Sequence, residues 1–388
     1  MGPGFRRDDE LIMVHSLYER LYFRPTAFVD SPVGGDGQIA RLAGGLVWFS
    51  AYELIIVADG RRTDGRLIAV DQVDAFIDTL PGDQATAARA TIGRITSPRP
   101  PMTIGGGLLR FDEPSVIGIL NMTPDSFSDG GAHLDDPEGA AASGLAMAAQ
   151  GAAIIDVGGE STRPGAATVW EGDEIARTEP IVRRLAAGGA VVSIDTRKAS
   201  VMAAALGAGA HIVNDVSALA YDPASAALLA ARDCPVVLMH HQGDPETMQA
   251  RPHYDDALID IYDWLEARIA FAEAAGIARS RIIVDPGIGF GKGLRHNLQL
   301  LNGLALFHGL GCPILLGASR KSIIGALSDA APADQRLGGS LAIALQGARL
   351  GVQLLRVHDV AETVQAIRVW RGMRDEASMP PPVYRGKA

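Results

Sequence analysis

The 388-residue chain has few cysteines, few lysines and no long uninterrupted hydrophobic run. Its two cysteines, Cys234 and Cys312, cannot build a disulfide framework or a zinc site of thiolates, so a reduced cytosol is the expected compartment. The longest apolar stretch, residues 42–58, contains Gly44 and Glu53 and falls short of the ~20 apolar residues of a membrane span. We therefore expect a cytoplasmic protein without a membrane partner.

Basic charge is also scarce, and most of it is arginine. The net charge of −10 argues against a broad nucleic-acid footprint, so we expect no nucleic-acid partner. Of the 35 basic residues only four are lysines. They are Lys198, Lys292, Lys321 and Lys387. Codon composition usually explains such a bias, but three of the four lysines fall beside turns that contain glycine or aspartate. That placement hints that a compact point charge is needed there.

From residue 113 onward, short apolar runs alternate with longer stretches rich in alanine and leucine. Continuous apolar runs with β-branched residues are typical of strands buried on both faces of a parallel sheet. The eight runs are 116–121, 152–158, 190–195, 211–215, 235–240, 281–286, 313–318 and 352–358. Eight such units over about 260 residues predict a (β/α)8 TIM barrel. The alternative, a doubly wound sheet that binds dinucleotides, would need G-x-G-x-x-G after the first run, where the sequence reads ILNMTPDSF.

The chain is expected to have three parts: a small α/β extension over 1–112, the barrel over 113–378 and a flexible tail over 379–388. In the extension, residues 44–70 predict strands joined by turns at Asp59-Gly60 and Asp64-Gly65, followed by a short helix around 71–80. The segment SPRPPMTIGGG (97–107) predicts a linker. Helices are expected between the barrel strands. They cover 137–150, 198–208, 256–275, 296–309, 334–350 and 359–374. We expect the extension to have a structural or oligomeric role rather than a catalytic one.

Polar residues stand at the ends of the apolar runs. They are Asn121, Asp156, Asp195, Asn214, Asp215, His240, Asp285 and His358. The C-terminal ends of the strands carry the active site in TIM barrels. So many polar groups on one rim would be costly to bury without a ligand, so the sequence predicts a binding site there.

Two loops and the carboxylates indicate what this site binds. The loop NMTPDSFSDGG (121–131) is too polar to lie in the hydrophobic core, so we expect it on the surface. The loop GGESTRPGA (158–166) offers hydroxyls, Arg163 and glycine amides, which are suited to binding phosphate. The same segment equally fits a solvated turn. Buried carboxylates such as Asp195 and Asp285 need donors, which an amino-substituted heterocycle with a ring N–H supplies. Paired carboxylates also suggest glycosidase chemistry, which depends on a separation that sequence does not give.

Three further motifs remain. The segment GIGFGKG lacks the G-x-x-x-x-G-K-[ST] pattern of a nucleotide P-loop. Arg356 and His358 are two positions apart, hence on one side of a strand, where they fit either an anion clamp or satisfied polar residues. Adjacent His240 and His241 point in opposite directions on a strand end, which disfavours a shared metal.

Taken together, these segments closely resemble the dihydropteroate synthase family of pterin-binding barrel enzymes. The matching segments are GILNMTPDSFSDGG, DVGGESTRPGA, SIDTRK, VNDVSAL, LMHHQG, VDPGIGFGKG, LLGASRKS and LRVHDV. They cover 113–375 in the family's order. The resemblance implies a transferase of folate biosynthesis that condenses 6-hydroxymethyl-7,8-dihydropterin diphosphate with 4-aminobenzoate, giving 7,8-dihydropteroate and diphosphate. It also implies Mg²⁺ as cofactor, a homodimer and a sulfonamide target.

The resemblance further assigns roles to individual residues. The pterin would be held by Asp156, Asp195, Asn214, Asp285 and Lys321. The diphosphate would be held by Asn121, Arg356 and His358, with Asn121 also a ligand of Mg²⁺. The aminobenzoate would be framed by Thr162, Arg163, Phe290 and Ser319. Asp129, Arg163 and Lys321 would be catalytic, in an SN1-like reaction in which diphosphate leaves before the aniline nitrogen attacks.

Two alternatives stay open. A methyltetrahydrofolate–corrinoid methyltransferase uses a related pterin barrel, but it should lack the loops TPDSFSDGG and STRPG. A catalytically silent paralogue that acts as a binding protein is the non-enzyme alternative. Intact Asn121, Asp129, Arg163, Lys321 and Arg356 argue against it.

Overall fold

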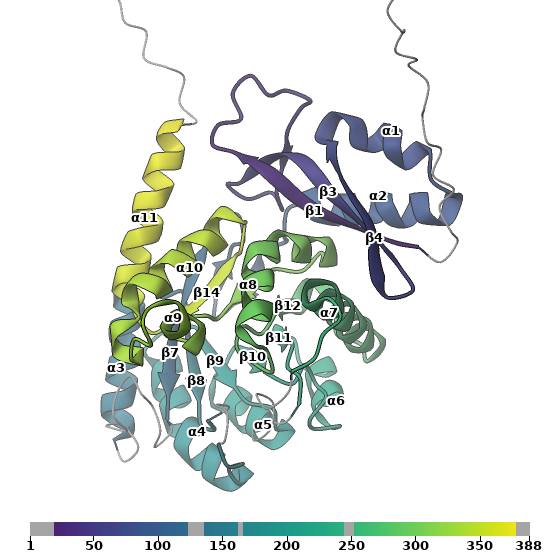
Figure 1. Ribbon diagram of the computed structural model, residues 1–388. Coiled ribbons are helices and arrows are strands. Elements are labelled where there is room, and N and C mark those ends of the chain that lie inside the picture. Colours follow the sequence, from purple (N-terminus) through teal and green to yellow (C-terminus); the bar gives the residue numbers. More distant parts are fainter. Residues whose placement is uncertain (1–18, 123–135, 162–165, 244–251, 378–388) are drawn as a thin grey trace, which may run out of the picture.

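A parallel barrel ringed by helices dominates the computed structural model, with a smaller α/β unit on one side (Figure 1). The structure describes residues 19–122, 136–161, 166–243 and 252–377. In the described residues no helix is both long enough and apolar enough to cross a membrane. The tail predicted for 379–388 lies outside the described residues.

Eight parallel strands form the barrel wall. They are β7 (Ser115–Asn121), β8 (Ile154–Gly158), β9 (Val192–Asp195), β10 (Ile212–Asp215), β11 (Val236–Met239), β12 (Ile282–Asp285), β13 (Leu315–Leu316) and β14 (Leu354–Val357). Their order in the sheet is β12-β11-β10-β9-β8-β7-β14-β13. A parallel bridge between Val284 and Ile314 closes the ring between β12 and β13. All eight predicted runs are therefore strands, and the TIM-barrel prediction is confirmed.

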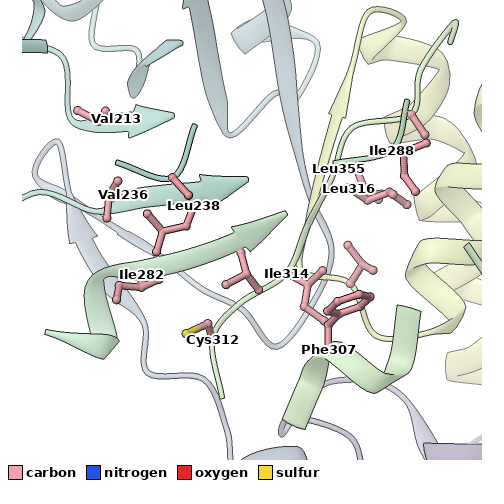
Figure 2. Close-up of a cluster of buried hydrophobic side chains, with 14 of the residues drawn as sticks. Val213, Val236, Leu238, Ile282, Ile288, Phe307, Cys312, Ile314, Leu316 and Leu355 are labelled. Atoms are coloured by element: carbon pink, nitrogen blue, oxygen red, sulfur yellow. The ribbon is translucent and has the colours of Figure 1, made fainter. Parts of the chain in front are cut away.

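The apolar runs are continuous because both faces of each strand are buried. On β8, Ile154 belongs to the cluster inside the barrel, whereas Ile155 belongs to the cluster between the strands and the helices. On β12, Ile283 points inward while Ile282 and Val284 point outward. The outer cluster also includes Leu238, Phe307 and Leu316, which are labelled in Figure 2. Side chains alternate along a strand, so every second residue reaches the barrel axis.

Helices cover the outside of the barrel. They are α3 (Pro137–Ala149), α4 (Glu171–Ala187), α5 (Ala199–Ala208), α6 (Ser225–Ala230), α7 (Ala257–Ala274), α8 (Leu294–Gly303), α9 (Ser322–Leu327), α10 (Leu337–Arg349) and α11 (Val360–Ala377). The six predicted helices are all present. The helix predicted over 296–309 is divided, because a 3₁₀ helix, η3 (Leu304–Leu310), follows α8.

The N-terminal unit is an antiparallel sheet with two helices. Its strands are β1 (Arg20–Val29), β2 (Ala40–Arg41), β3 (Trp48–Ala58) and β4 (Arg61–Ala69), and its helices are α1 (Val73–Asp78) and α2 (Gly82–Thr96). The predicted turn at Asp59-Gly60 is confirmed, since both residues have positive φ, 49° and 72°. The predicted turn at Asp64-Gly65 is wrong: both residues lie within β4, paired with Ile56 and Ile55. The short helix expected around 71–80 is α1.

This unit is attached to the barrel through α7 and η3. Tyr22 donates a hydrogen bond to Asp263 Oδ1 at 2.8 Å, and its ring meets that of Tyr262 edge-on at 5.5 Å. Arg99, only 6% exposed, donates to the carbonyl oxygens of Arg94 at 2.6 Å and His308 at 2.9 Å. The N-terminal unit and the barrel thus share a hydrogen-bonded interface.

The linker prediction for 97–107 is only partly right. Residues 102–109 form a hairpin of β5 (Met102–Ile104) and β6 (Gly107–Leu109). Met102 and Ile104 belong to the same buried cluster as Ile154, Ile212 and Ile283 of the barrel interior. Those residues lie toward the N-terminal ends of their strands, so the hairpin closes the barrel end opposite the predicted site.

Candidate active site

The alternation that buries the strands also aims polar side chains at the barrel axis. Asp156 follows the inward Ile154 by two residues, and Asn214 follows Ile212 in the same way. Asp285 follows Ile283, and Arg356 follows Leu354. These four residues therefore form the polar layer of the barrel interior at the C-terminal ends of β8, β10, β12 and β14.

Arg356 is the centre of this layer. Its Nε donates to Asp156 Oδ2 at 2.6 Å, and its Nη2 donates to Asp195 Oδ2 at 2.8 Å. Asn214 Nδ2 donates to the same Asp156 oxygen at 3.0 Å. Among the described residues, Oδ1 of Asp156 and Oδ1 of Asp195 are buried acceptors without a hydrogen-bond donor. Leaving such oxygens unpaired is costly, so the layer is suited to a ligand that brings N–H donors.

Asp285 and Lys321 form a second part of the site. Asp285 Oδ1 accepts the backbone N–H of Gly287 at 2.7 Å. Lys321 follows β13, donates from Nζ to the carbonyl oxygen of Ile288, and lies 4.4 Å above the centre of the Phe290 ring. The rim therefore carries an ammonium and an aromatic face beside a buried carboxylate.

The remaining predicted residues lie on the same rim. Asn121 ends β7, and its Oδ1 comes within 3.3 Å of the position that a Cβ on Gly158 would occupy. Ser319 Oγ lies 3.1 Å from His358 Nδ1 and accepts the backbone N–H of His358 at 3.3 Å. Asp129, Thr162 and Arg163 lie outside the described residues.

Burial shifts the pKa values of these groups. Burial raises the pKa of Asp195 to about 7, although Arg356 opposes the shift, and the neighbouring Asp156 adds to it. Burial likewise raises the pKa of Asp285, against the effects of Lys321 and the Gly287 amide. Burial lowers the pKa of Lys321 to about 8, while Asp285 opposes the shift. Perturbed titratable groups in one cluster are typical of a functional site.

Two of the polar residues at the ends of the apolar runs do not face the site. Asp215 is fully buried, and its carboxylate accepts the N–H groups of Ser217 at 2.7 Å and Leu219 at 2.9 Å, so it caps its own turn. His240 Nδ1 accepts a hydrogen bond from Lys292 Nζ at 2.9 Å. The expectation that all eight polar ends converge on a ligand is therefore wrong for these two.

Sequence reasoning missed a buried ion network behind β8 and β9. Lys198 Nζ contacts Glu160 Oε1 at 3.0 Å and Glu174 Oε2 at 2.6 Å, and donates to the carbonyl oxygen of Val169 at 2.6 Å. Glu160 also accepts hydrogen bonds from the Val169 N–H at 2.9 Å and from Arg197 Nε at 3.1 Å. The scarcity of lysine was the available signal, because Lys198, Lys292 and Lys321 each lie in a polar cluster.

The described residues offer no cluster of three or more histidine, cysteine, aspartate or glutamate side chains that could hold a metal. Asn121 presents a single neutral oxygen. Mg²⁺ accepts such a ligand when substrate phosphate and water complete its shell. The residues therefore fit an ion that arrives with a phosphate, rather than one held by the protein alone.

Comparison with known proteins identifies the family to which this barrel belongs. Residues 117–358 match the family described as pterin binding enzyme. The dihydropteroate synthase of Escherichia coli (strain K12) is 48% identical over 265 residues, which cover 68% of this chain and 93% of the relative. The N-terminal unit lies outside the matched family region.

Solved structures of dihydropteroate synthases are also similar to this chain. A Yersinia pestis dihydropteroate synthase in complex with a sulfonamide drug has 45% identity and a TM-score of 0.69, covering 71% of this chain and 100% of that one. A Xanthomonas albilineans dihydropteroate synthase with 4-aminobenzoic acid has 45% identity and a TM-score of 0.67, covering 73% and 100%. The chain therefore belongs to the dihydropteroate synthase family of pterin-binding transferases.

Proposed function

We propose that this chain condenses 6-hydroxymethyl-7,8-dihydropterin diphosphate with 4-aminobenzoate, releasing 7,8-dihydropteroate and diphosphate. The observation that carries the proposal is the polar layer inside the barrel. There Arg356 holds one oxygen each of Asp156 and Asp195, and the other oxygens have no donor among the described residues. The amino group and ring N–H of a pterin are donors of the kind that this layer lacks.

In this proposal the pterin lies across the polar layer. Asp195 and Asp285 accept hydrogen bonds from the amino-pyrimidine edge, Asn214 supplies an amide, and Lys321 donates to the ring carbonyl and ring nitrogen. Asp156 holds Asn214 and Arg356 in place through Oδ2. Asp156, Asp195, Asn214 and Arg356 are already joined by hydrogen bonds, so this part of the layer needs little rearrangement on binding.

The diphosphate would lie above β7 and β14, held by Asn121, Arg356 and His358. Two donors of Arg356 point to carboxylates, which fixes the plane of its guanidinium before the anion binds. Mg²⁺ would be held by Asn121, and it would neutralise charge on the departing diphosphate. His358 is oriented by its contact with Ser319 Oγ.

The aminobenzoate would be framed by Phe290 and Ser319 together with Thr162 and Arg163. Departure of diphosphate leaves a cation at the pterin methylene, which Asp129 would stabilise and the aniline nitrogen would attack. An aniline is a weak nucleophile, so creating the electrophile first lowers the demand on it. Water competes for this cation, so excluding water from the site protects the intermediate.

The proposal for the pterin is tested by replacing its acceptor. Asp285→Asn places a donor where the pterin presents donors and leaves an unsatisfied group, which costs about 2–4 kcal/mol. Calorimetry with the pterin diphosphate should show this loss while circular dichroism shows an unchanged fold. An unchanged dissociation constant would remove Asp285 from the pterin site.

The homodimer and the division into an extension (1–112), a barrel (113–378) and a tail (379–388) also remain proposals. Support for a dimer comes from α11, which exposes Val369 (59%) and Met373 (63%) on the barrel surface. The two residues are four positions apart and so lie on one face of the helix, where they would form part of an apolar patch of the kind that marks interaction sites. Light scattering of the purified chain should give twice the monomer mass, and a monomer would contradict it.

A further inference from the structure

Lys292 is a buried cation in the turn between β12 and α8. Its side chain is almost fully buried, and Nζ lies 2.8 Å from the Gly287 carbonyl oxygen and 2.9 Å from that of Phe290. The same Nζ lies 2.9 Å from His240 Nδ1 and 3.3 Å from the His240 carbonyl oxygen. An ammonium has three N–H donors, and these four acceptors use all of them. The turn is therefore built around one buried amino group, although burial lowers the pKa of Lys292 well below its usual value.

The backbone of this turn has little freedom. Gly287 and Gly291 have φ values of 68° and 63°, and a Cβ on either would collide with the carbonyl oxygen of His240 or Gln242. From the other side, Asn297 of α8 accepts the Gly289 N–H at 2.7 Å. The turn is thus packed against the chain that follows β11 and hydrogen-bonded to α8.

Three groups of the candidate site depend on this backbone. The Gly287 N–H donates to Asp285 Oδ1 at 2.7 Å. The Ile288 carbonyl accepts from Lys321 Nζ, and the Phe290 ring lies 4.4 Å below the same ammonium. Gly287 and Phe290 are also the residues whose carbonyl oxygens Lys292 binds. Lys292 and the site residues therefore contact the same turn.

Lysine suits this place better than arginine does. The four acceptors converge on one atom, which matches a compact ammonium, whereas the planar guanidinium spreads its donors over a fork. The chain otherwise uses arginine for most of its basic residues. This explains why a lysine stands in the GIGFGKG motif, which is not a nucleotide P-loop.

We propose that Lys292 is a positioning residue for the pterin pocket. Its amino group fixes the 287–290 backbone, and this backbone holds Asp285, Lys321 and Phe290 in their positions in the site. The inference rests on the proposed function, because it takes Asp285 and Lys321 as pterin ligands. It assigns to Lys292 no contact with the substrate.

The test replaces Lys292 by methionine, which keeps the length of the side chain and removes its charge. The dissociation constant of the pterin diphosphate, measured without aminobenzoate, should rise about tenfold or more, which corresponds to the loss of one or more hydrogen bonds in the pocket. Binding of inorganic diphosphate with Mg²⁺ should stay within about twofold, because Asn121, Arg356 and His358 lie on or beside β7 and β14. Equal losses for both ligands would show general disruption and overturn the proposal.

Arg99→Met is a matched control. Arg99 is also a buried cation that binds backbone carbonyl oxygens, but it lies beside η3, which precedes β13 at the opposite end of the barrel. This variant should lower the melting temperature and leave pterin binding unchanged. If Lys292→Met does not fold, Asn297→Ala removes the other support of the turn and should weaken pterin binding in the same direction.

The outcomes separate this inference from the proposed function. Unchanged pterin binding in a folded Lys292→Met protein, or in Asn297→Ala where the first does not fold, would refute the positioning role. If Asp285→Asn loses pterin binding in the same experiment, the proposed function stands and only this inference fails. If Asp285→Asn also binds normally, the pterin site itself is wrong.

Discussion

Arg356 Nη2 donates a hydrogen bond to Asp195 Oδ2 at 2.8 Å, joining two strands that are not neighbours in the barrel. The side chain of Arg356 is 18% exposed and that of Asp195 is 14% exposed, so the pair is shielded but can be reached from the rim. A buried pair of this kind contributes little net stability, because desolvation of both charges offsets their attraction. Its effect is geometric: it fixes the orientation of a carboxylate and a guanidinium, the two groups proposed to bind the pterin and the diphosphate.

The first prediction concerns pH. In the proposed pterin site Asp195 accepts donors only when it is ionised, so affinity should fall as pH drops below about 7, the value to which burial raises its pKa. Lys321 must be protonated to donate, so affinity should fall as pH rises above about 8. The dissociation constant of the pterin diphosphate should therefore pass through a minimum between these values.

Two variants show which residue causes the loss of affinity on each side of that pH minimum. Asp195→Asn should flatten the acid limb, apart from a contribution of Asp285, whose pKa is also raised by burial. Lys321→Met should flatten the alkaline limb. The charges that act on the pKa of Asp195 are those of Arg356, Asp156, Glu174 and Asp215, and the charges that act on that of Lys321 are those of Asp285, Arg356 and Asp195. An affinity that does not change between about pH 5.5 and 9 would contradict these roles.

The second prediction concerns the metal. Because Asn121, the proposed ligand, offers only one neutral oxygen, Mg²⁺ alone should show no saturable binding in calorimetry, and binding should appear when diphosphate is added. Asn121→Ala should weaken Mg²⁺-diphosphate binding by about 1 kcal/mol or more. Tight Mg²⁺ binding without diphosphate would show that the protein holds the ion itself.

The third prediction concerns the hairpin at the closed end of the barrel. Ile104 is 4% exposed and packs in the cluster that fills the barrel interior. Ile104→Ala should lower the free energy of unfolding by about 2–4 kcal/mol, measured by denaturant titration. The exposed neighbour Leu108, 58% exposed, provides the control, and Leu108→Ala should change stability by less than about 1 kcal/mol. Equal effects would mean that 102–109 is a linker after all.

The sequence was sufficient to predict the barrel and most of the polar layer. The runs that became β7 to β14 are apolar on both faces, and the period of two places Asp156, Asn214, Asp285 and Arg356 on the inner face once the strands are known. Asp215 has the same kind of position at a run end, but the amides of Ser217 and Leu219 lie within reach of its carboxylate. Whether a carboxylate caps its own turn or meets a ligand depends on local backbone geometry, which the sequence pattern does not specify.

Other features depend on segments far apart in the chain. Lys292 is recognisable as the centre of a turn only when His240 is beside it, 52 residues away. Lys198 likewise joins Glu160 and Glu174 from two other segments. At Asp64-Gly65 the turn-forming residues lie within a strand, because pairing of β4 with β3 continues past them with a register shift near Ile56. Tertiary pairing overrides local turn preference there.

We propose that the chain joins a pterin diphosphate to 4-aminobenzoate at the barrel rim. The most direct test is a steady-state assay with both substrates and Mg²⁺, following 7,8-dihydropteroate and diphosphate together, with Asp285→Asn as the matched variant. We expect the two products in equal amounts from the unaltered chain and at least a tenfold lower kcat/KM from the folded variant, about 1.4 kcal/mol or more of lost transition-state stabilisation. Absence of dihydropteroate from the folded, unaltered chain, or equal rates from both proteins, would contradict the account.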